Sequence, residues 1–156
     1  MTTATDVQVD TSGAGGRQAL RAALYARVSS DKQREESVTD QFRVCERLCA
    51  RERFTVFSRH SDLFISGGTT SRPGYQALLA SARRREYDVI IAEDLKRLWR
   101  EQAEQWRAIK ELIDLGIHIV TASGIDSRQQ NFEILASVMT AANQGLRWLR
   151  PLKSSS

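Results

Sequence analysis

The segment YDVIIAED, residues 87–94, constrains the fold of this chain more than any other. It holds an uninterrupted apolar run from Val89 to Ala92, with an acidic residue on either side. A run of this kind, without alternating polar positions, is typical of a parallel strand that is covered on both faces. Parallel strands need long crossover connections, which are usually helices. The segment therefore indicates an α/β domain.

Three further segments have the composition of strands. Together with the apolar run, the predicted strands cover residues 20–28, 54–62, 87–94 and 117–123. Segments with helical periodicity separate them, which is the pattern of a sheet built from βαβ units. We therefore predict a mostly parallel sheet of four to five strands with helices on both faces.

The predicted helices have recognisable ends. Ser37 is predicted to cap the first helix, which ends near residue 53. Pro73 is predicted to occupy the first position of the second helix, and Gly116 to end the third. A long final helix begins near Asn131, and its apolar stripe reaches Leu149. We divide the chain into a disordered tail at residues 1–16, a domain at 17–127, a long C-terminal helix at 128–150 and a second tail at 151–156.

The charge of the chain indicates an anionic partner. The sequence of 156 residues has a net charge of +4, and arginine supplies most of its positive groups. The planar guanidinium suits phosphate, so this bias favours a nucleic acid or a phosphorylated ligand. No apolar run is long enough to span a membrane, and the N-terminus lacks the pattern of a signal peptide. We therefore expect a cytoplasmic protein without a membrane partner.

The two cysteines do not form the pattern of a metal site. Cys45 and Cys49 are four residues apart, on one face of the first predicted helix. Reduced cysteines in such a place behave as small apolar residues. His60 and His118 have no spacing that would complete a set of ligands with them. We expect neither a metal nor a cofactor.

Polar residues gather where the predicted strands end. In open α/β sheets, ligands bind beyond the carboxyl ends of the strands. The residues that the sequence places there are Arg27, Ser29 and Ser30, then Asp62, Ser66 and Arg72, then Glu93, Asp94, Lys96, Arg97 and Arg100, and finally Thr121 and Ser123. Arginines and a lysine would thus surround one or two serine hydroxyls. This arrangement predicts a phosphate ligand.

Three segments in the same order carry a resemblance to a known family. YARVSSDKQ, DLFISGGTTSRPG and DVIIAEDLKRLWR together resemble the signature of the serine site-specific recombinases. These are the resolvases, the invertases and their large integrase-like relatives, and the spacing is more similar to the large members. The resemblance covers about residues 20–142. It implies a resolvase-like catalytic domain at residues 17–127 and an oligomerisation helix at 128–150.

The resemblance also implies a reaction and its partners. Members of the family cut double-stranded DNA through a covalent 5′-phosphoserine link and rejoin exchanged strands, without a metal or a nucleotide cofactor. The resemblance implies a homodimer that forms a tetramer in the synaptic complex. The residues matched to catalytic positions are Ser29 as the nucleophile and Arg27, Arg72, Arg97 and Arg100 as phosphate ligands. The residues matched to supporting positions are Gln33, Gln41, Asp62, Ser66 and Lys96. Tyr25 is predicted to pack, and Ser30 is the weaker candidate nucleophile.

Some positions depart from the pattern of the family. Lys96 stands where the family commonly has an aspartate, and a lysine there could bind phosphate or donate a proton. The final helix lacks the family's Glu-Arg pair, and Gly145 interrupts it at a cost of about 1 kcal/mol. We also expect no downstream DNA-binding region, so that the chain binds DNA weakly and mainly through phosphates.

Other interpretations stay open at this point. An inactive recombinase fragment that dimerises would explain Lys96 and the altered final helix. A metal-dependent nuclease would hold Mg²⁺ with Glu93, Asp94 and Asp62, although the nearby arginines would compete with the cation. A module for a small phosphorylated ligand would need a glycine-rich phosphate loop, which the short SGGTT segment does not provide.

Overall fold

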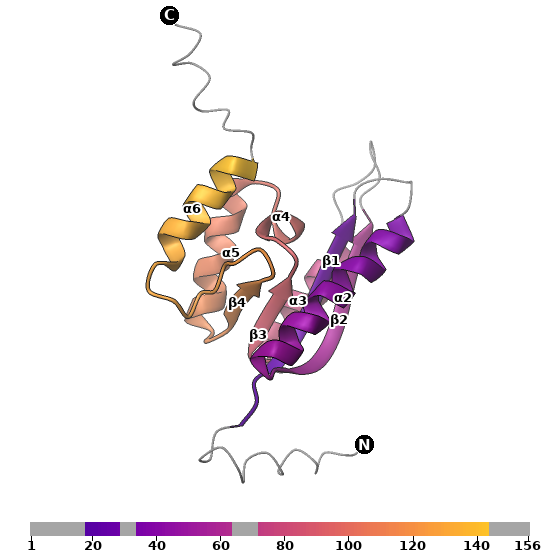
Figure 1. The fold of residues 1–156 in the computed structure, drawn as a ribbon. Helices are drawn as coiled ribbons and strands as arrows, with labels where there is room; N and C mark the ends of the chain where they lie inside the picture. Colours follow the sequence, from indigo (N-terminus) through magenta and orange to yellow (C-terminus); the bar gives the residue numbers. More distant parts are fainter. Residues whose placement is uncertain (1–17, 29–33, 64–71, 144–156) are drawn as a thin grey trace, which may run out of the picture.

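The computed structural model describes residues 18–28, 34–63 and 72–143, and within them the chain forms a parallel sheet. The sheet has four strands in the order β2-β1-β3-β4. The strands are β1 at Arg21–Val28, β2 at Thr55–Leu63, β3 at Val89–Ala92 and β4 at His118–Thr121. Every neighbouring pair is parallel, so the predicted α/β class is confirmed (Figure 1).

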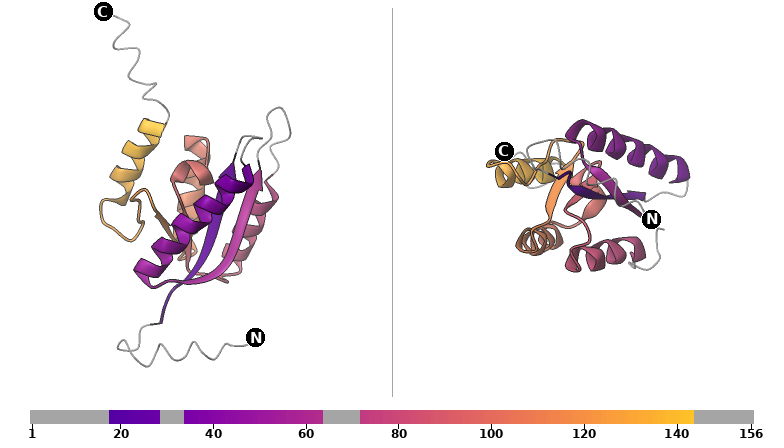
Figure 2. Two further views of the ribbon diagram at one scale, coloured as in Figure 1. Left: turned by 45° about the vertical axis from the view of Figure 1, so that its right-hand side comes forward. Right: turned by 90° about the horizontal axis from the view of Figure 1, so that it is seen from below.

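Helices cover both faces of this sheet, as predicted. They are α2 at Arg34–Glu52, α3 at Pro73–Arg83, α4 at Leu95–Leu98, α5 at Gln102–Asp114 and α6 at Phe132–Asn143. Figure 2 shows α2 on one side of the sheet and α3 and α5 on the other. Ala22 and Leu24 of β1 pack into the cluster that contains the α2 side chains, whereas Ala23 and Tyr25 pack into the cluster of α3 and α5. Because both faces are covered, the strand reads as a continuous apolar run.

The helix ends agree with the sequence in two places and differ in one. Pro73 is the first residue of α3, and Gly116 follows α5 with φ of +83°, both as predicted. The Ile117 amide donates to the carbonyl of Leu112 at 2.8 Å, which is the bond of a Schellman motif. The prediction that Ser37 caps the first helix is wrong, because α2 begins at Arg34. The residues that precede Ser37 are good helix formers, so the helix extends past it.

The final helix is described over only part of its predicted length. α6 covers Phe132–Asn143, and the rest of the predicted helix at 128–150 beyond residue 143 lies outside the described residues, as do the tails at 1–16 and 151–156. Phe132 and Ala136 of α6 are buried in the cluster that also contains side chains of α3, α4 and α5. The Gln105 side-chain amide of α5 donates to the Thr140 hydroxyl of α6 at 2.8 Å, which fixes the two helices relative to each other. Among the described helices, none has the length and apolar content that a bilayer span requires.

The buried cysteines give a test of the α2 face. Cys45 and Cys49 are buried and unpaired with each other, and burial raises the pKa of Cys45 to about 12 and that of Cys49 to about 11. The thiolate is the reactive form, so the folded protein should react with a thiol reagent at about pH 8 roughly a hundredfold more slowly than the protein in urea. Absorbance of the released chromophore measures both rates. Equal rates would show that this face of α2 is open to solvent.

Candidate active site

The strand order fixes where a ligand can bind. The chain turns from β1 to β2 on one side and reaches β3 on the other side of β1, so the direction of winding reverses between β1 and β3. Ligands of open α/β sheets bind at such a switch point, beyond the carboxyl ends of the strands. At this place β1 ends with Arg27 and Val28, and β3 is followed by Glu93 and Asp94. The residues predicted to bind phosphate therefore lie at the expected edge of the sheet.

Arg27 is held at the end of β1 by bonds to its backbone and to its guanidinium. Pairing of β1 with β3 ends at Tyr25, which leaves the Arg27 backbone without a strand on that side. The Gln41 side chain of α2 takes the place of the missing strand, because its amide accepts from the Arg27 N–H and donates to the Arg27 carbonyl, both at 3.1 Å. Gln41 is thus a positioning residue for the arginine.

The Arg27 guanidinium binds the carboxyl end of α4. Its Nε donates to the carbonyl of Arg97 at 2.9 Å, and its Nη2 donates to the carbonyl of Lys96. The last carbonyls of a helix have no partner within the helix and attract cations. The short α4 therefore orients Arg27 through its free carbonyls. In return, Nη1 of Arg97 donates to the carbonyl of Arg27 at 3.1 Å.

Arg72 is also bound to α4, and it has aromatic and acidic side chains as further partners. Its Nη2 donates to the carbonyl of Leu98 at 2.6 Å and to the hydroxyl of Tyr25 at 3.2 Å. Its guanidinium carbon lies 3.9 Å from the ring centre of Tyr75, and Nη1 lies 3.7 Å from a carboxylate oxygen of Glu104. The Arg72 side chain is 16% exposed, and its buried Nε has no hydrogen-bond partner within the described part of the chain. Much of this guanidinium is therefore engaged by the fold itself.

The three other arginines at this edge of the sheet affect the charge of Arg27. The pKa of Arg27 is lowered, first by burial and then by the positive charge of Arg72, with smaller effects from Arg100 and Arg97. The side chain of Tyr25 opposes this shift. Cations held so close together repel one another, and an anion between or beside them relieves the repulsion. The cluster of Arg27, Arg72, Arg97 and Arg100 is called the arginine cluster below.

Asp62 supports this cluster from the neighbouring strand. Its carboxylate accepts from the hydroxyl of Tyr25 at 2.6 Å and from the backbone amides of Gly74 and Tyr75, both at 2.8 Å. Asp62 therefore caps α3, whose own N-cap residue, Arg72, makes no capping bond with its side chain. A Cβ atom at Gly74 would lie 2.2 Å from the carbonyl oxygen of Ser61, so only glycine fits there. Burial and then the bond to Asp62 raise the pKa of Tyr25.

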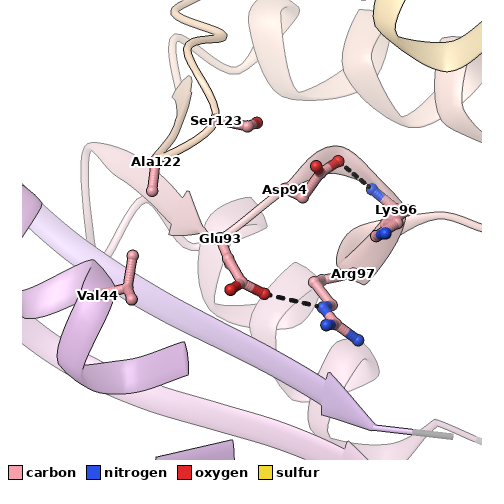
Figure 3. Close-up of a pocket in the computed structure, with 7 residues that line it drawn as sticks. All are labelled: Val44, Glu93, Asp94, Lys96, Arg97, Ala122 and Ser123. Atoms are coloured by element: carbon pink, nitrogen blue, oxygen red, sulfur yellow. Dashed lines mark hydrogen bonds and ion pairs between the residues drawn. The ribbon is translucent and has the colours of Figure 1, made fainter. Parts of the chain in front are cut away.

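The two carboxylates after β3 have partners of their own (Figure 3). Glu93 accepts from Nε of Arg97 at 3.1 Å, and Asp94 caps α4 by accepting from the Lys96 amide at 3.1 Å. They line a pocket of about 410 Å³ whose other walls are Val44 of α2, Lys96 and Arg97 of α4, and Ala122 and Ser123 after β4. Asp62 belongs to the capping network of α3 instead. Among the described residues, no three groups of the kinds that ligate metals come together. The carboxylates of the nuclease interpretation are therefore not gathered into one site.

Thr121 and Ser123, at the end of β4, have their hydroxyls within hydrogen-bonding distance of each other, at 2.8 Å. Ser29, Ser30, Gln33 and Ser66 lie outside the described residues. Ser29 follows Val28, the last residue of β1, directly in the sequence. Glu93 and Glu104 make ion pairs with the arginine cluster that were not predicted from the sequence. The spacing of four between Glu93 and Arg97 was a usable signal, whereas Glu104 had none.

Comparisons with known proteins agree with this geometry. The family model described as "Resolvase, N terminal domain" matches residues 22–148. The N-terminal catalytic domain of TP901-1 integrase is similar over 83% of this chain and 98% of its own, at 23% identity with a TM-score of 0.67. The C-terminal catalytic domain of ISC1926 TnpA, an IS607-like serine recombinase, is similar over 66% of this chain and 67% of its own, at 29% identity with a TM-score of 0.56.

A third similar structure is a resolvase family site-specific recombinase from Streptococcus pneumoniae. It is 18% identical, covers 87% of this chain and 93% of its own, and has a TM-score of 0.65. A search of the curated proteins found no match. At 23% and 18% identity, the integrase and the Streptococcus recombinase support only the fold. The family model supports membership of the resolvase family.

Proposed function

Because this chain belongs to the resolvase family of serine recombinases, we propose that it cuts and rejoins double-stranded DNA through a 5′-phosphoserine intermediate. Ser29 is the nucleophile in this proposal. The observation that carries it is the arginine cluster, which converges on the end of β1 one or two residues before Ser29. In this proposal the protein acts in the cytoplasm, where its DNA substrate lies.

The cluster suits the transition state better than the bound substrate. A phosphodiester carries one negative charge, and more charge develops on its oxygens as a fifth oxygen approaches phosphorus. Arg27 and Arg97 are already oriented by bonds to each other's backbone, so little reorganisation is needed when that charge develops. Interactions that strengthen in the transition state accelerate the reaction. Metal is not required for this neutralisation.

The proposed step conserves one phosphodiester bond. The Ser29 oxygen attacks phosphorus and loses its proton, the bond from phosphorus to the 3′ oxygen breaks, and that oxygen gains a proton. The reverse attack by a 3′ hydroxyl restores the DNA strand and frees Ser29. Gln33, Ser66 and Lys96 keep their proposed supporting roles, with Lys96 as a ligand or proton donor in place of the family's aspartate.

We propose that α6 joins two copies of the chain, as a first stage toward the tetramer of a synaptic complex. Phe132 and Ala136 are buried on one side of α6, whereas Ile134 is 71% exposed and Val138 is 59% exposed one turn apart on the other side. Two large apolar residues at this spacing form a stripe that a second α6 can cover.

Substitution of this stripe tests the dimer. Ile134→Asp should weaken self-association by about tenfold or more, because a charge is costly to bury in an apolar contact. Sedimentation velocity measures the dimer fraction. Ile113→Asp is the matched control, since Ile113 is an apolar residue of α5 that is 45% exposed. Equal loss of association in both variants would argue against α6 as the contact.

A covalent-capture experiment tests the function. The chain is incubated in EDTA with supercoiled plasmids that carry randomised inserts, and the mixture is denatured so that only DNA bonded to protein is retained. We expect retained DNA with the unaltered chain. Cleavage that requires Mg²⁺ and leaves no adduct would support the nuclease interpretation. If the unaltered chain binds DNA without forming an adduct, and Lys96→Asp forms one, the result would support the interpretation as an inactive dimerising fragment.

A further inference from the structure

Glu93 connects the sheet to the arginine cluster. It is the first residue after β3, and its carbonyl accepts from the Ser123 amide at 3.1 Å, which continues the pairing of β3 with the chain after β4. The backbone of Glu93 is therefore fixed at the edge of the sheet. Its carboxylate accepts from Nε of Arg97 at 3.1 Å, across one turn of chain (Figure 3).

Hydrogen bonds join Arg97 to both Glu93 and Arg27. Its Nε donates to Glu93, its Nη1 donates to the carbonyl of Arg27 at 3.1 Å, and its own carbonyl accepts from Nε of Arg27 at 2.9 Å. The side chains of Arg97 and Glu93 are 27% and 37% exposed, so solvent screens this pair only partly. The orientation of one arginine thus depends on the other.

A carboxylate is needed at this point because the cluster repels Arg97. Arg27 and Arg97 lie close enough for the charge of Arg97 to lower the pKa of Arg27. A guanidinium beside other cations, and without a counter-charge, gains free energy by turning toward water. Glu93 opposes that movement from a rigid anchor. It binds Nε, the nitrogen nearest the backbone, so the outer nitrogens remain directed by the contact with Arg27.

We propose that Glu93 is a positioning residue of the strand-exchange reaction, which holds the Arg97 guanidinium where it neutralises charge on the attacked phosphate. The inference rests on the proposed function. It assigns Glu93 a role through Arg97, without contact to DNA. The nuclease interpretation would instead make the same carboxylate a metal ligand.

The proposal predicts opposite effects on binding and on reaction. Glu93→Ala removes a negative charge near DNA phosphates, so affinity for a duplex oligonucleotide should stay equal or rise. The rate of adduct formation should fall about 10- to 100-fold, which is the usual effect of losing a residue that orients a catalytic group. Glu93→Gln keeps an oxygen that can accept from Arg97 and should lose less than the alanine variant. Loss of folding would instead lower affinity and rate together.

Glu111→Ala is the matched control. Glu111 pairs with Nε of Arg83 at 2.7 Å, on α5 and α3, so the change removes the same charge from a similar ion pair. Its adduct rate should equal that of the unaltered chain. Equal losses in the Glu93 and Glu111 variants would overturn the proposal, because net charge alone would then explain them.

An NMR measurement separates this proposal from the function on which it rests. The Nε proton of Arg97 should exchange with water at least about tenfold faster in Glu93→Ala than in the unaltered chain, because a hydrogen-bonded proton is protected. Absence of an adduct from the unaltered chain refutes the proposed function and any role in it. Equal adduct rates with and without Glu93, or an unchanged proton exchange rate, refute the positioning role alone.

Discussion

Arg27→Ala is expected to lower the rate of adduct formation by about 10²- to 10³-fold, with a much smaller change in affinity for DNA. Losses of this size follow removal of one preorganised donor from a site where charge develops. Arg27 is only 8% exposed and is oriented by two carbonyls of α4, so its guanidinium is already in place before the substrate binds. Single-turnover kinetics on the captured adduct measures the rate.

The charge of Arg27 alone should not be sufficient. Arg27→Lys keeps a cation but cannot bond two carbonyls and a phosphate in one plane, so it should restore little of the rate. Arg21→Ala is the control, because Arg21 begins the same strand and pairs with Asp88 at the opposite end of the sheet. Its rate should be unchanged. An Arg27→Ala rate within about threefold of the unaltered chain would contradict the role of Arg27 as a phosphate ligand.

Asp62→Ala is expected to lower the free energy of unfolding by about 3–5 kcal/mol. The substitution leaves the Tyr25 hydroxyl and the amides of Gly74 and Tyr75 without their acceptor, in a place where Asp62 is 8% exposed. Buried polar groups without partners cost free energy because water cannot replace the lost bond. Urea unfolding followed by circular dichroism measures the change.

Two variants set the scale for Asp62. Asp62→Asn keeps one carbonyl oxygen and should lose about half as much as the alanine variant. Asp40→Ala removes an exposed carboxylate that pairs with Arg43 at 3.0 Å within α2, and it should change the free energy of unfolding by about 0.5 kcal/mol or less. If Asp62→Ala were as mild as Asp40→Ala, the capping role of Asp62 would be wrong.

The strands could be predicted from the sequence because successive residues of a strand point to opposite faces of the sheet, and helices cover both faces. Val89 and Ile91 pack with α2, and Ile90 and Ala92 pack with α3 and α5, so every position of β3 had to be apolar. The edge at which Arg27 and Arg97 meet followed from the rule that ligands bind beyond strand ends. These inferences needed only local patterns and the parallel topology.

The contacts that orient the cluster could not be predicted, because they join distant segments. The Leu95–Leu98 segment has no helical period of its own, yet it forms α4, whose carbonyls bind Arg27 and Arg72. The sequence predicted that Arg72 binds phosphate. In the structure, much of its guanidinium contacts Tyr25, the carbonyl of Leu98 and the ring of Tyr75. No residue pattern reports which acceptor a long side chain will reach.

Mass spectrometry of the captured adduct tests the central claim most directly. After digestion of the protein and the DNA, the account predicts a nucleotide phosphate bonded to Ser29, its loss in Ser29→Ala and its persistence in Ser30→Ala. A nucleotide on Ser30, or an adduct that survives in Ser29→Ala, would contradict the assignment of Ser29 as the nucleophile.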